Sequence, residues 1–130
     1  MPLYQKHALG KEGEEYTINA LRAQNYEIVQ KNYRSPYGEI DIIARDGHFL
    51  VFIEVKTRTN ETIEQAQKSI TYHKQKKITK TAMCFIHSYQ DSEIKEYRFD
   101  VVIIKKEKDR YDTHHLKDAF PPAEVGEFFA

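Results

Sequence analysis

The sequence lacks several features that mark particular classes of protein. Its 130 residues include one cysteine, so no disulfide can form within the chain. The longest apolar runs, Phe49–Ile53 and Ala82–Ile86, have five residues each, far fewer than the roughly 20 that span a bilayer. Residues 1–11 contain no apolar segment of the kind found in secretory signal peptides. We therefore expect a cytoplasmic protein with no membrane partner.

The chain also lacks an excess of charge and several common catalytic motifs. Its 20 Lys and Arg balance 20 Asp and Glu, which argues against a protein that coats nucleic acid through net charge. No glycine-rich phosphate loop, Cys-x-x-Cys pair or nucleophile-elbow serine is present. Charge is nevertheless uneven, because five lysines and no carboxylate lie between Gln65 and Gln90. This stretch is either a basic binding face or a solvated helix face, and charge alone does not separate the two.

The first half of the chain predicts one helix followed by β-strands. Apolar residues at three- and four-residue spacings predict a helix from Gly13 to Gln24, with Asn25 as its left-handed cap. Turn residues at Ser35–Gly38 and a hairpin turn at Arg45–His48 separate three β-rich runs. These runs are Tyr26–Tyr33, Glu39–Ala44 and Phe49–Thr57.

The second half predicts further helices and strands. The expected helices are a short one over Thr62–Ser69 capped by Asn60, a longer one after Thr71 with Ile78, Ala82, Phe85, Ile86 and Tyr89 buried, and a last one over Pro121–Phe128. The expected strands are Tyr97–Ile104 and a weaker edge strand at Tyr111–Leu116, joined by a turn at Lys105–Arg110. The core order αβββαβ predicts an α/β fold with a mixed central sheet flanked by helices, in a single domain over residues 1–130.

Two carboxylates and a lysine fall close together on the predicted hairpin. Because side chains alternate along a strand, Glu54 and Lys56 share one face with Leu50 and Phe52. A hairpin symmetric about Asp46 and Gly47 puts Asp41 opposite Phe52 and diagonal to Glu54, at roughly 7 to 8 Å between backbones. Two carboxylates at such a separation can share one cation, whereas a register slip of one residue would separate them.

This combination of residues suits metal-dependent phosphodiester hydrolysis. Mg²⁺ is usually held by one or two carboxylates and several waters, and it can activate a water and neutralise charge on a phosphoryl oxygen. A neighbouring ammonium can stabilise the charge that develops on phosphorus. Glu54-Val55-Lys56 alone is a weak signal, because a surface salt bridge on an amphipathic strand has the same pattern. Glu14 is either a further metal ligand or a first-turn glutamate that complements the helix dipole.

Several segments together resemble a known family. They are Gly13-Glu14, Asn25-Tyr26, Asn32-Tyr33-Arg34, Gly38-Glu39-Ile40-Asp41, Glu54-Val55-Lys56-Thr57-Arg58, Lys74-Gln75, Phe99-Asp100-Val101 and Asp118-Ala119-Phe120. In this order they resemble the YraN family of small bacterial proteins, over about residues 10–120. The chain departs from the family in having Asn25 where relatives usually have glycine, and Tyr72 where they often have proline.

The resemblance implies a restriction-endonuclease-like fold, similar to archaeal Holliday-junction resolvases. It implies that Glu14, Asp41 and Glu54 are metal ligands for Mg²⁺ or Mn²⁺, and that Lys56 joins Asp41 and Glu54 as the catalytic lysine. It also implies DNA contacts at residues outside this cluster. We assign these contacts to Arg58, Lys74, Gln75, Lys76 and Lys77.

We therefore expect a metal-dependent DNA endonuclease, with branched or junction DNA as the substrate implied by the resolvase similarity. Assembly as a homodimer is left open. Two alternatives remain: a DNA-binding module without turnover, and an interaction protein in which the charged cluster is structural. Other candidates carry less weight. Asp100 is expected to be a paired structural carboxylate, and the adjacent His114 and His115 point to opposite faces of a strand and so do not share a metal.

Overall fold

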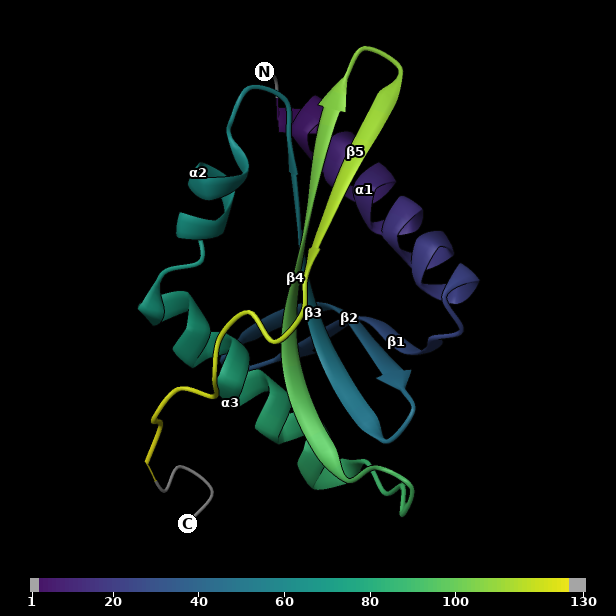
Figure 1. The fold of residues 1–130 in the computed structure, drawn as a ribbon. Helices are drawn as coiled ribbons and strands as arrows, with labels where there is room; N and C mark the ends of the chain where they lie inside the picture. Colours follow the sequence, from purple (N-terminus) through teal and green to yellow (C-terminus); the bar gives the residue numbers. More distant parts are fainter. Residues whose placement is uncertain (1–2, 127–130) are drawn as a thin grey trace.

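The chain folds around a five-stranded sheet with helices on both faces, as Figure 1 shows. The computed structural model describes residues 3–126, with side chains described from residue 8. In chain order the elements are α1 (Leu3–Ala23), β1 (Glu27–Ser35), β2 (Gly38–Asp46), β3 (Phe49–Arg58), α2 (Ile63–Lys68), α3 (Tyr72–Ser88), β4 (Glu96–Glu107) and β5 (Arg110–Leu116). The predicted α/β class is confirmed.

The sheet is mixed, with its strands side by side in sequence order. Strand β3 pairs parallel with β4, and the other neighbours pair antiparallel. Parallel neighbours need a long connection across one face of the sheet, and α2 and α3 form this connection. The central strands are thus covered on both faces.

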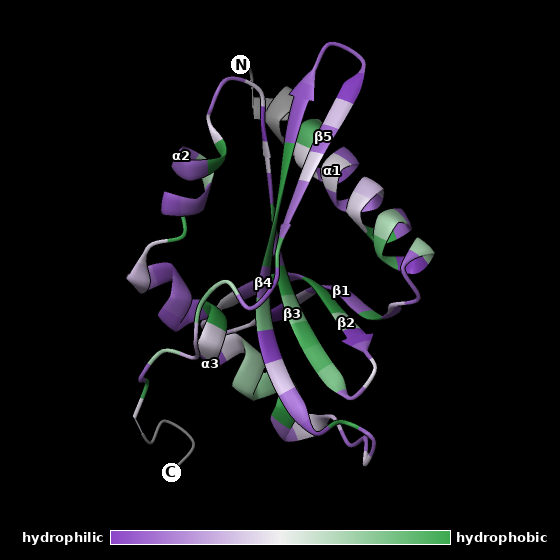
Figure 2. Ribbon diagram, viewed as in Figure 1, coloured by the Kyte–Doolittle hydropathy of each residue, from purple (hydrophilic) through white to green (hydrophobic). Residues whose placement is uncertain are grey.

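Two apolar clusters hold the helices against the sheet. On one face, Ile18 and Leu21 of α1 pack in a cluster with Val51 and Ile53 of β3. On the other face, the buried stripe of α3 packs against Phe52 and its neighbours on the sheet. The stripe is as predicted: Ile78, Ala82 and Phe85 are buried, and Ile86 and Tyr89 are half-buried against them. Figure 2 shows the same division, with hydrophobic residues concentrated in the middle strands and hydrophilic residues on the outer helix surfaces.

The helix boundaries agree with the sequence in part. Asn25 has φ 67°, as predicted for the left-handed residue after α1, and the Thr71 side chain caps α3 by accepting from the Lys74 amide at 3.3 Å. The predicted cap Asn60 of α2 is wrong. Thr62 caps α2 instead, because Thr62 and Gln65 form a reciprocal capping box.

Helix α1 begins at Leu3, well before the predicted start at Gly13. The residues that precede Gly13 favour a helix by propensity but lack the apolar spacing on which the prediction rested. As a consequence, Glu14 lies in the middle of a helix rather than in its first turn. The alternative role for Glu14, complementing the helix dipole, is therefore excluded.

The hairpin between β2 and β3 is shifted by two residues from the predicted register. Asp46 pairs with Phe49 and Ile42 with Ile53, so the turn residues are Gly47 and His48, with Gly47 at φ 62°. A shift of two residues keeps the paired side chains of β2, from Ile42 to Asp46, on their predicted faces. Phe52 pairs with Ile43 and the ladder ends at Ile42 and Ile53, so Asp41 is not opposite Phe52 as predicted.

Two predictions for the C-terminal part are wrong. The predicted turn at Lys105–Arg110 is mostly strand, because the β4–β5 ladder continues to the pair Glu107 and Arg110. Opposite charges face each other across this ladder, which stabilises it. Residues 121–126 form no helix, and the rest of the helix predicted to reach Phe128 lies outside the described residues. In the described part of the chain, no helix is long and apolar enough to cross a membrane.

Candidate active site

Asp41 lies where β2 parts from β3. The β2–β3 ladder ends at the pair Ile42 and Ile53, while β3 continues to pair with β4 as far as Arg58. Beyond this point the Val55 amide donates to Asp41 Oδ2 at 2.8 Å. A side chain, rather than the β2 backbone, thus accepts this hydrogen bond, and the bond fixes the orientation of the Asp41 carboxylate.

Glu54 and Lys56 lie beside Asp41 on the face of β3 that α3 covers. Lys56 Nζ is 3.6 Å from Glu54 Oε1, and each side chain is only 17% exposed. Burial, followed by the charge of the neighbouring Asp41, raises the pKa of Glu54 to about 8, while Lys56 opposes the shift. At neutral pH the Glu54 carboxyl therefore holds a proton that a cation could displace.

Glu14 approaches Asp41 from α1, on the opposite face of the sheet. Burial, followed by the charge of Asp41 and a hydrogen bond with it, raises the pKa of Glu14 to about 7. The approach depends on Gly13, which is buried against β3. A Cβ atom at Gly13 would lie 2.0 Å from Thr57 Oγ1, so a side chain there would push α1 away from the sheet.

Asp41 is thus the shared neighbour of two carboxyls that come from opposite faces. Glu54 shares one face of the sheet with α3, while Glu14 comes from α1 on the other. Across the described part of the chain, no three His, Cys, Asp or Glu side chains are grouped so that they could hold a metal ion as they stand. The predicted set of Glu14, Asp41 and Glu54 therefore stays a prediction.

The chemistry of these donors nevertheless fits a hard divalent cation. Mg²⁺ needs only one or two protein carboxylates, and Asp41 and Glu54 are adjacent. The raised pKa values of Glu14 and Glu54 show that negative charge is costly in this cluster when no cation is present. A cation would offset that cost.

A hollow of about 160 Å³ connects Glu54 and Lys56 to the basic stretch of α3. We call it the lysine-lined hollow, and its lining also includes Lys74, Lys77 and Glu39. Two of the predicted DNA-binding lysines therefore border the same space as the predicted catalytic pair. Glu39 was missed by the sequence argument, although it belongs to the Gly38-Glu39-Ile40-Asp41 segment that carried the resemblance.

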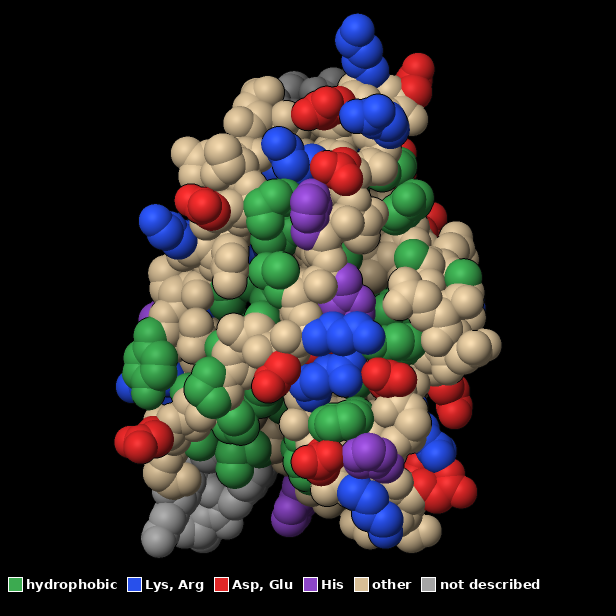
Figure 3. Space-filling view, in the orientation of Figure 1, with side chains coloured by type: hydrophobic (Ala, Val, Ile, Leu, Met, Phe, Trp, Pro, Cys, Tyr) green, Lys and Arg blue, Asp and Glu red, His purple; other side chains and the backbone are tan. Residues whose placement is uncertain are grey.

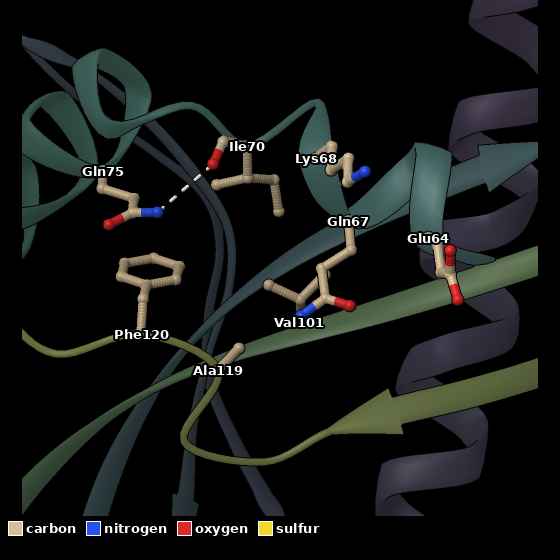
Figure 4. A pocket seen from close by; sticks show the side chains of 8 residues that line it. All are labelled: Glu64, Gln67, Lys68, Ile70, Gln75, Val101, Ala119 and Phe120. Atoms are coloured by element: carbon tan, nitrogen blue, oxygen red, sulfur yellow. Dashed lines mark hydrogen bonds between the residues drawn. The ribbon is translucent and has the colours of Figure 1, made fainter.

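The other predicted DNA-binding residues lie elsewhere. The Lys76 ammonium is 5.2 Å from the centre of the Tyr72 ring and does not line this hollow. Gln75 donates to the Ile70 carbonyl at 3.2 Å and faces a second hollow, drawn in Figure 4. Arg58 donates to Glu61 at 2.6 Å and to the Thr57 carbonyl at 3.0 Å. These bonds give Arg58 a local structural role beside any contact with DNA.

Asp100 belongs to a separate buried network. Its carboxylate accepts from Arg98 at 2.8 Å, from the Asp118 amide at 2.9 Å, and lies 2.7 Å from His115 Nε2. Hydrogen bonds from His115, Arg98 and the Asp118 amide outweigh burial and lower the pKa of Asp100. As expected, Asp100 is paired, and His114 has a different partner, Asp112, at 3.2 Å.

This network joins β4 and β5 to the segment that follows them. On the face in Figure 3, Lys and Arg side chains gather beside carboxylates and histidines over these strands. The sequence offered no signal for the role of Arg98, which also bonds Tyr26 at 3.1 Å from a distant part of the chain.

The fold and the cluster define a class of protein. The sheet is mixed and five-stranded, with α1 on one face and the α2–α3 crossover on the other. Strands β2 and β3 separate beside a cluster of two acidic residues and a lysine. This arrangement is consistent with a restriction-endonuclease-like core.

Comparison with known proteins identifies the family. The sequence profile described as "Uncharacterised protein family UPF0102" matches residues 13–104. A UPF0102 protein of Thermodesulfovibrio yellowstonii is 44% identical over 114 residues, which cover 86% of this chain and 95% of that protein. A UPF0102 protein of Geotalea uraniireducens is 41% identical over 114 residues, covering 87% of this chain and 89% of that protein. The chain belongs to this family, and the predicted YraN resemblance is confirmed.

Proposed function

We propose that this protein is a DNA endonuclease that hydrolyses phosphodiester bonds with the help of Mg²⁺ or Mn²⁺. One observation carries the proposal: Asp41, held by the Val55 amide, adjoins Glu14 and Glu54, and Glu54 lines the lysine-lined hollow together with its ion-pair partner Lys56. The names of the relatives give a family and no activity, so the chemistry of the cluster is the support. A cytoplasmic location is part of the proposal.

Asp41 and Glu54 would hold the cation, with Glu14 as a further ligand. When bound, the cation would supply a more acidic water and a positive charge beside the phosphoryl oxygens. Lys56, whose Nζ lies 3.6 Å from Glu54 Oε1, would stabilise the negative charge that develops on phosphorus. Lys56 is mostly buried, so this charge would act in a region of low dielectric.

Lys74 and Lys77 would bind the DNA backbone next to the cleaved bond. Both line the hollow that Glu54 and Lys56 also line, so a phosphate bound by the two lysines would lie next to the proposed catalytic residues. Salt-dependent contacts of this kind contribute most of the affinity of such proteins for nucleic acid. Branched or junction DNA is the substrate class we propose.

The proposal is tested with a panel of linear, nicked, flapped and four-way DNA incubated with Mg²⁺ or Mn²⁺. We expect cleavage of at least one branched substrate and none in EDTA. DNA binding without cleavage on any member of the panel would favour a binding module of the same fold. Neither binding nor cleavage would indicate a structural charge cluster.

A further inference from the structure

A second hollow lies next to the candidate active site, between α2, α3 and the segment after β5. Its volume is about 390 Å³, at the small end of the ~300 to 1,000 Å³ typical of small-ligand sites. Figure 4 shows the side chains that line it. We call it the amide-lined hollow, because the amides of Gln67 and Gln75 face it from two helices.

The amide-lined hollow and the candidate catalytic cluster are neighbours on one face of the sheet. Val101, which forms part of its lining, is the direct partner of Glu54 in the parallel β3–β4 ladder. Neighbouring strands are about 4.8 Å apart. Ile70 lines both the amide-lined and the lysine-lined hollows and so lies between them. One nucleotide could therefore have its phosphate in the lysine-lined hollow and its base in the other.

The lining suits a flat ring with polar edges. Ile70, Val101 and Phe120 supply apolar surface, and the Phe120 ring is held in place by stacking on Phe99 at 5.1 Å between ring centres. Gln75 donates one hydrogen bond to the Ile70 carbonyl, and this bond fixes the orientation of its amide. The side-chain oxygen points away from Ile70. Side-chain amides match the paired donors and acceptors on nucleobase edges.

We propose that the amide-lined hollow binds an unpaired nucleobase of the DNA strand whose phosphate lies at Glu54 and Lys56. This inference rests on the proposed function and makes it more specific. A base inside a duplex is stacked and paired, so it cannot enter a hollow between α2, α3 and the segment after β5 unless it leaves the stack. The preferred substrate would therefore carry an unpaired nucleotide at the cleaved position, as a flap does.

The test measures binding in EDTA, so it does not depend on cleavage. A fluorescent single-stranded oligonucleotide is compared with a set in which one abasic nucleotide is moved along the strand. For the unmodified protein, we expect one abasic position to weaken binding by about 5- to 150-fold, the range for losing one well-made base contact. Other positions should have little effect.

Two variants change the hollow and one serves as a control. Gln67→Ala removes an exposed amide, and Ala119→Leu reduces the space in the hollow. Both should weaken binding of the intact strand and should be insensitive to the critical abasic position, because the base contact is already lost. Gln90→Ala changes an exposed glutamine beyond the far end of α3 and should behave like the unmodified protein.

The outcomes separate this inference from the proposed function. Equal binding of every abasic strand, or variants that still respond to the critical position, would overturn the base site even if the protein cleaves DNA. Base-dependent binding without cleavage would support the hollow and contradict the endonuclease. Failure to bind any single strand would overturn the base site outright.

Discussion

Asp41 is the residue on which the candidate site depends. Its carboxylate is fixed by the Val55 amide at 2.8 Å, and its charge helps to raise the pKa of both Glu14 and Glu54. Burial is the larger cause for both groups. Ionisation of Glu14 and Glu54 at high pH therefore destabilises the folded protein. A single substitution that removes one of these carboxyls can measure the effect.

The pH dependence of stability should depend on Glu54. Its pKa is raised from an ordinary 4.5 to about 8 in the folded chain, so the folded state binds the proton more tightly than the unfolded state. This contribution to stability is complete below about pH 4.5 and is lost as the pH rises toward 8. Glu54→Gln mimics the protonated group and should be more stable than the unmodified protein at pH 8.5, by on the order of 1 to 3 kcal/mol.

Urea unfolding in EDTA across pH 5 to 9 measures this difference. The advantage of the variant should shrink as the pH is lowered, and Mg²⁺ should stabilise only the unmodified protein. An advantage that does not change with pH would contradict the shifted pKa of Glu54.

Lys56 should matter for rate more than for metal binding. Lys56→Met keeps the apolar stem and removes the ammonium, so metal affinity should stay similar or rise as a nearby positive charge disappears. Single-turnover cleavage should fall by about 100-fold or more, as when one electrostatic stabiliser is removed from a preorganised site. Calorimetric metal titration beside the rate measurement separates the two effects. Loss of metal binding together with rate would give Lys56 a structural role in holding Glu54.

At the scale of elements, the position of α1 depends on its contact with β3. Gly13 lies so close to Thr57 that an added Cβ would be 2.0 Å from the hydroxyl oxygen. Thr17 Oγ1 donates to the Gly13 carbonyl at 2.8 Å, and Ile18 and Leu21 are buried one and two turns further along. The same packing therefore holds the helix and brings Glu14 to Asp41.

Gly13→Ala should destabilise the protein even though alanine favours a helix. Overpacking of a tight contact typically costs about 1 to 3 kcal/mol, which exceeds the roughly 1 kcal/mol that alanine gains over glycine within a helix. Gly10→Ala is the matched control, because a Cβ there meets nothing within 4 Å. Thermal unfolding should show a lower midpoint for the first variant and an equal or higher one for the second. The reverse order would mean that α1 does not approach β3 as closely as described.

Helix α3 should contact DNA through one side only. Lys74 and Lys77 line the hollow with Glu54 and Lys56, whereas Lys76 lies by the Tyr72 ring. Each phosphate contact contributes about 0.9 to the slope of log K against log salt on duplex DNA. Replacing Lys74 and Lys77 by glutamine should reduce the slope by about 2, and Lys76→Gln should leave it nearly unchanged. Equal effects of all three lysines would indicate general attraction rather than a defined face.

For the whole molecule, patterns of short range in the sequence predicted the architecture well. Alternation along β3 put Glu54 and Lys56 on the correct face, and the periodicity of α3 identified its buried stripe. The predicted hairpin register was wrong by two residues, because the turn is Gly47 and His48 rather than Asp46 and Gly47. An even shift leaves the paired side chains on their predicted faces. Capping chemistry identified Thr71 and Asn25 correctly.

Features that depend on distant contacts were not predictable in the same way. The sequence could not show that β2 leaves β3 at Asp41, since this follows from where the ladder ends in space. Nor could it assign Gln75 to a different hollow from Lys74, because adjacent helix residues point about 100° apart and only packing decides what each faces. The Arg98–Asp100 pair likewise gains its partners Tyr26 and His115 from other strands and segments.

The most direct test of the central claim is single-turnover cleavage of branched DNA in Mg²⁺ by the unmodified protein, Asp41→Asn and Glu54→Gln. Asp41→Asn removes a charge that opposes ionisation of Glu14 and Glu54, and Glu54→Gln mimics the protonated carboxyl, so both variants should fold at least as stably as the unmodified protein in EDTA. We expect their cleavage rates to fall by about 100-fold or more, while circular dichroism and thermal unfolding show an intact fold. Cleavage at the unmodified rate by both folded variants would contradict the assignment of the active site.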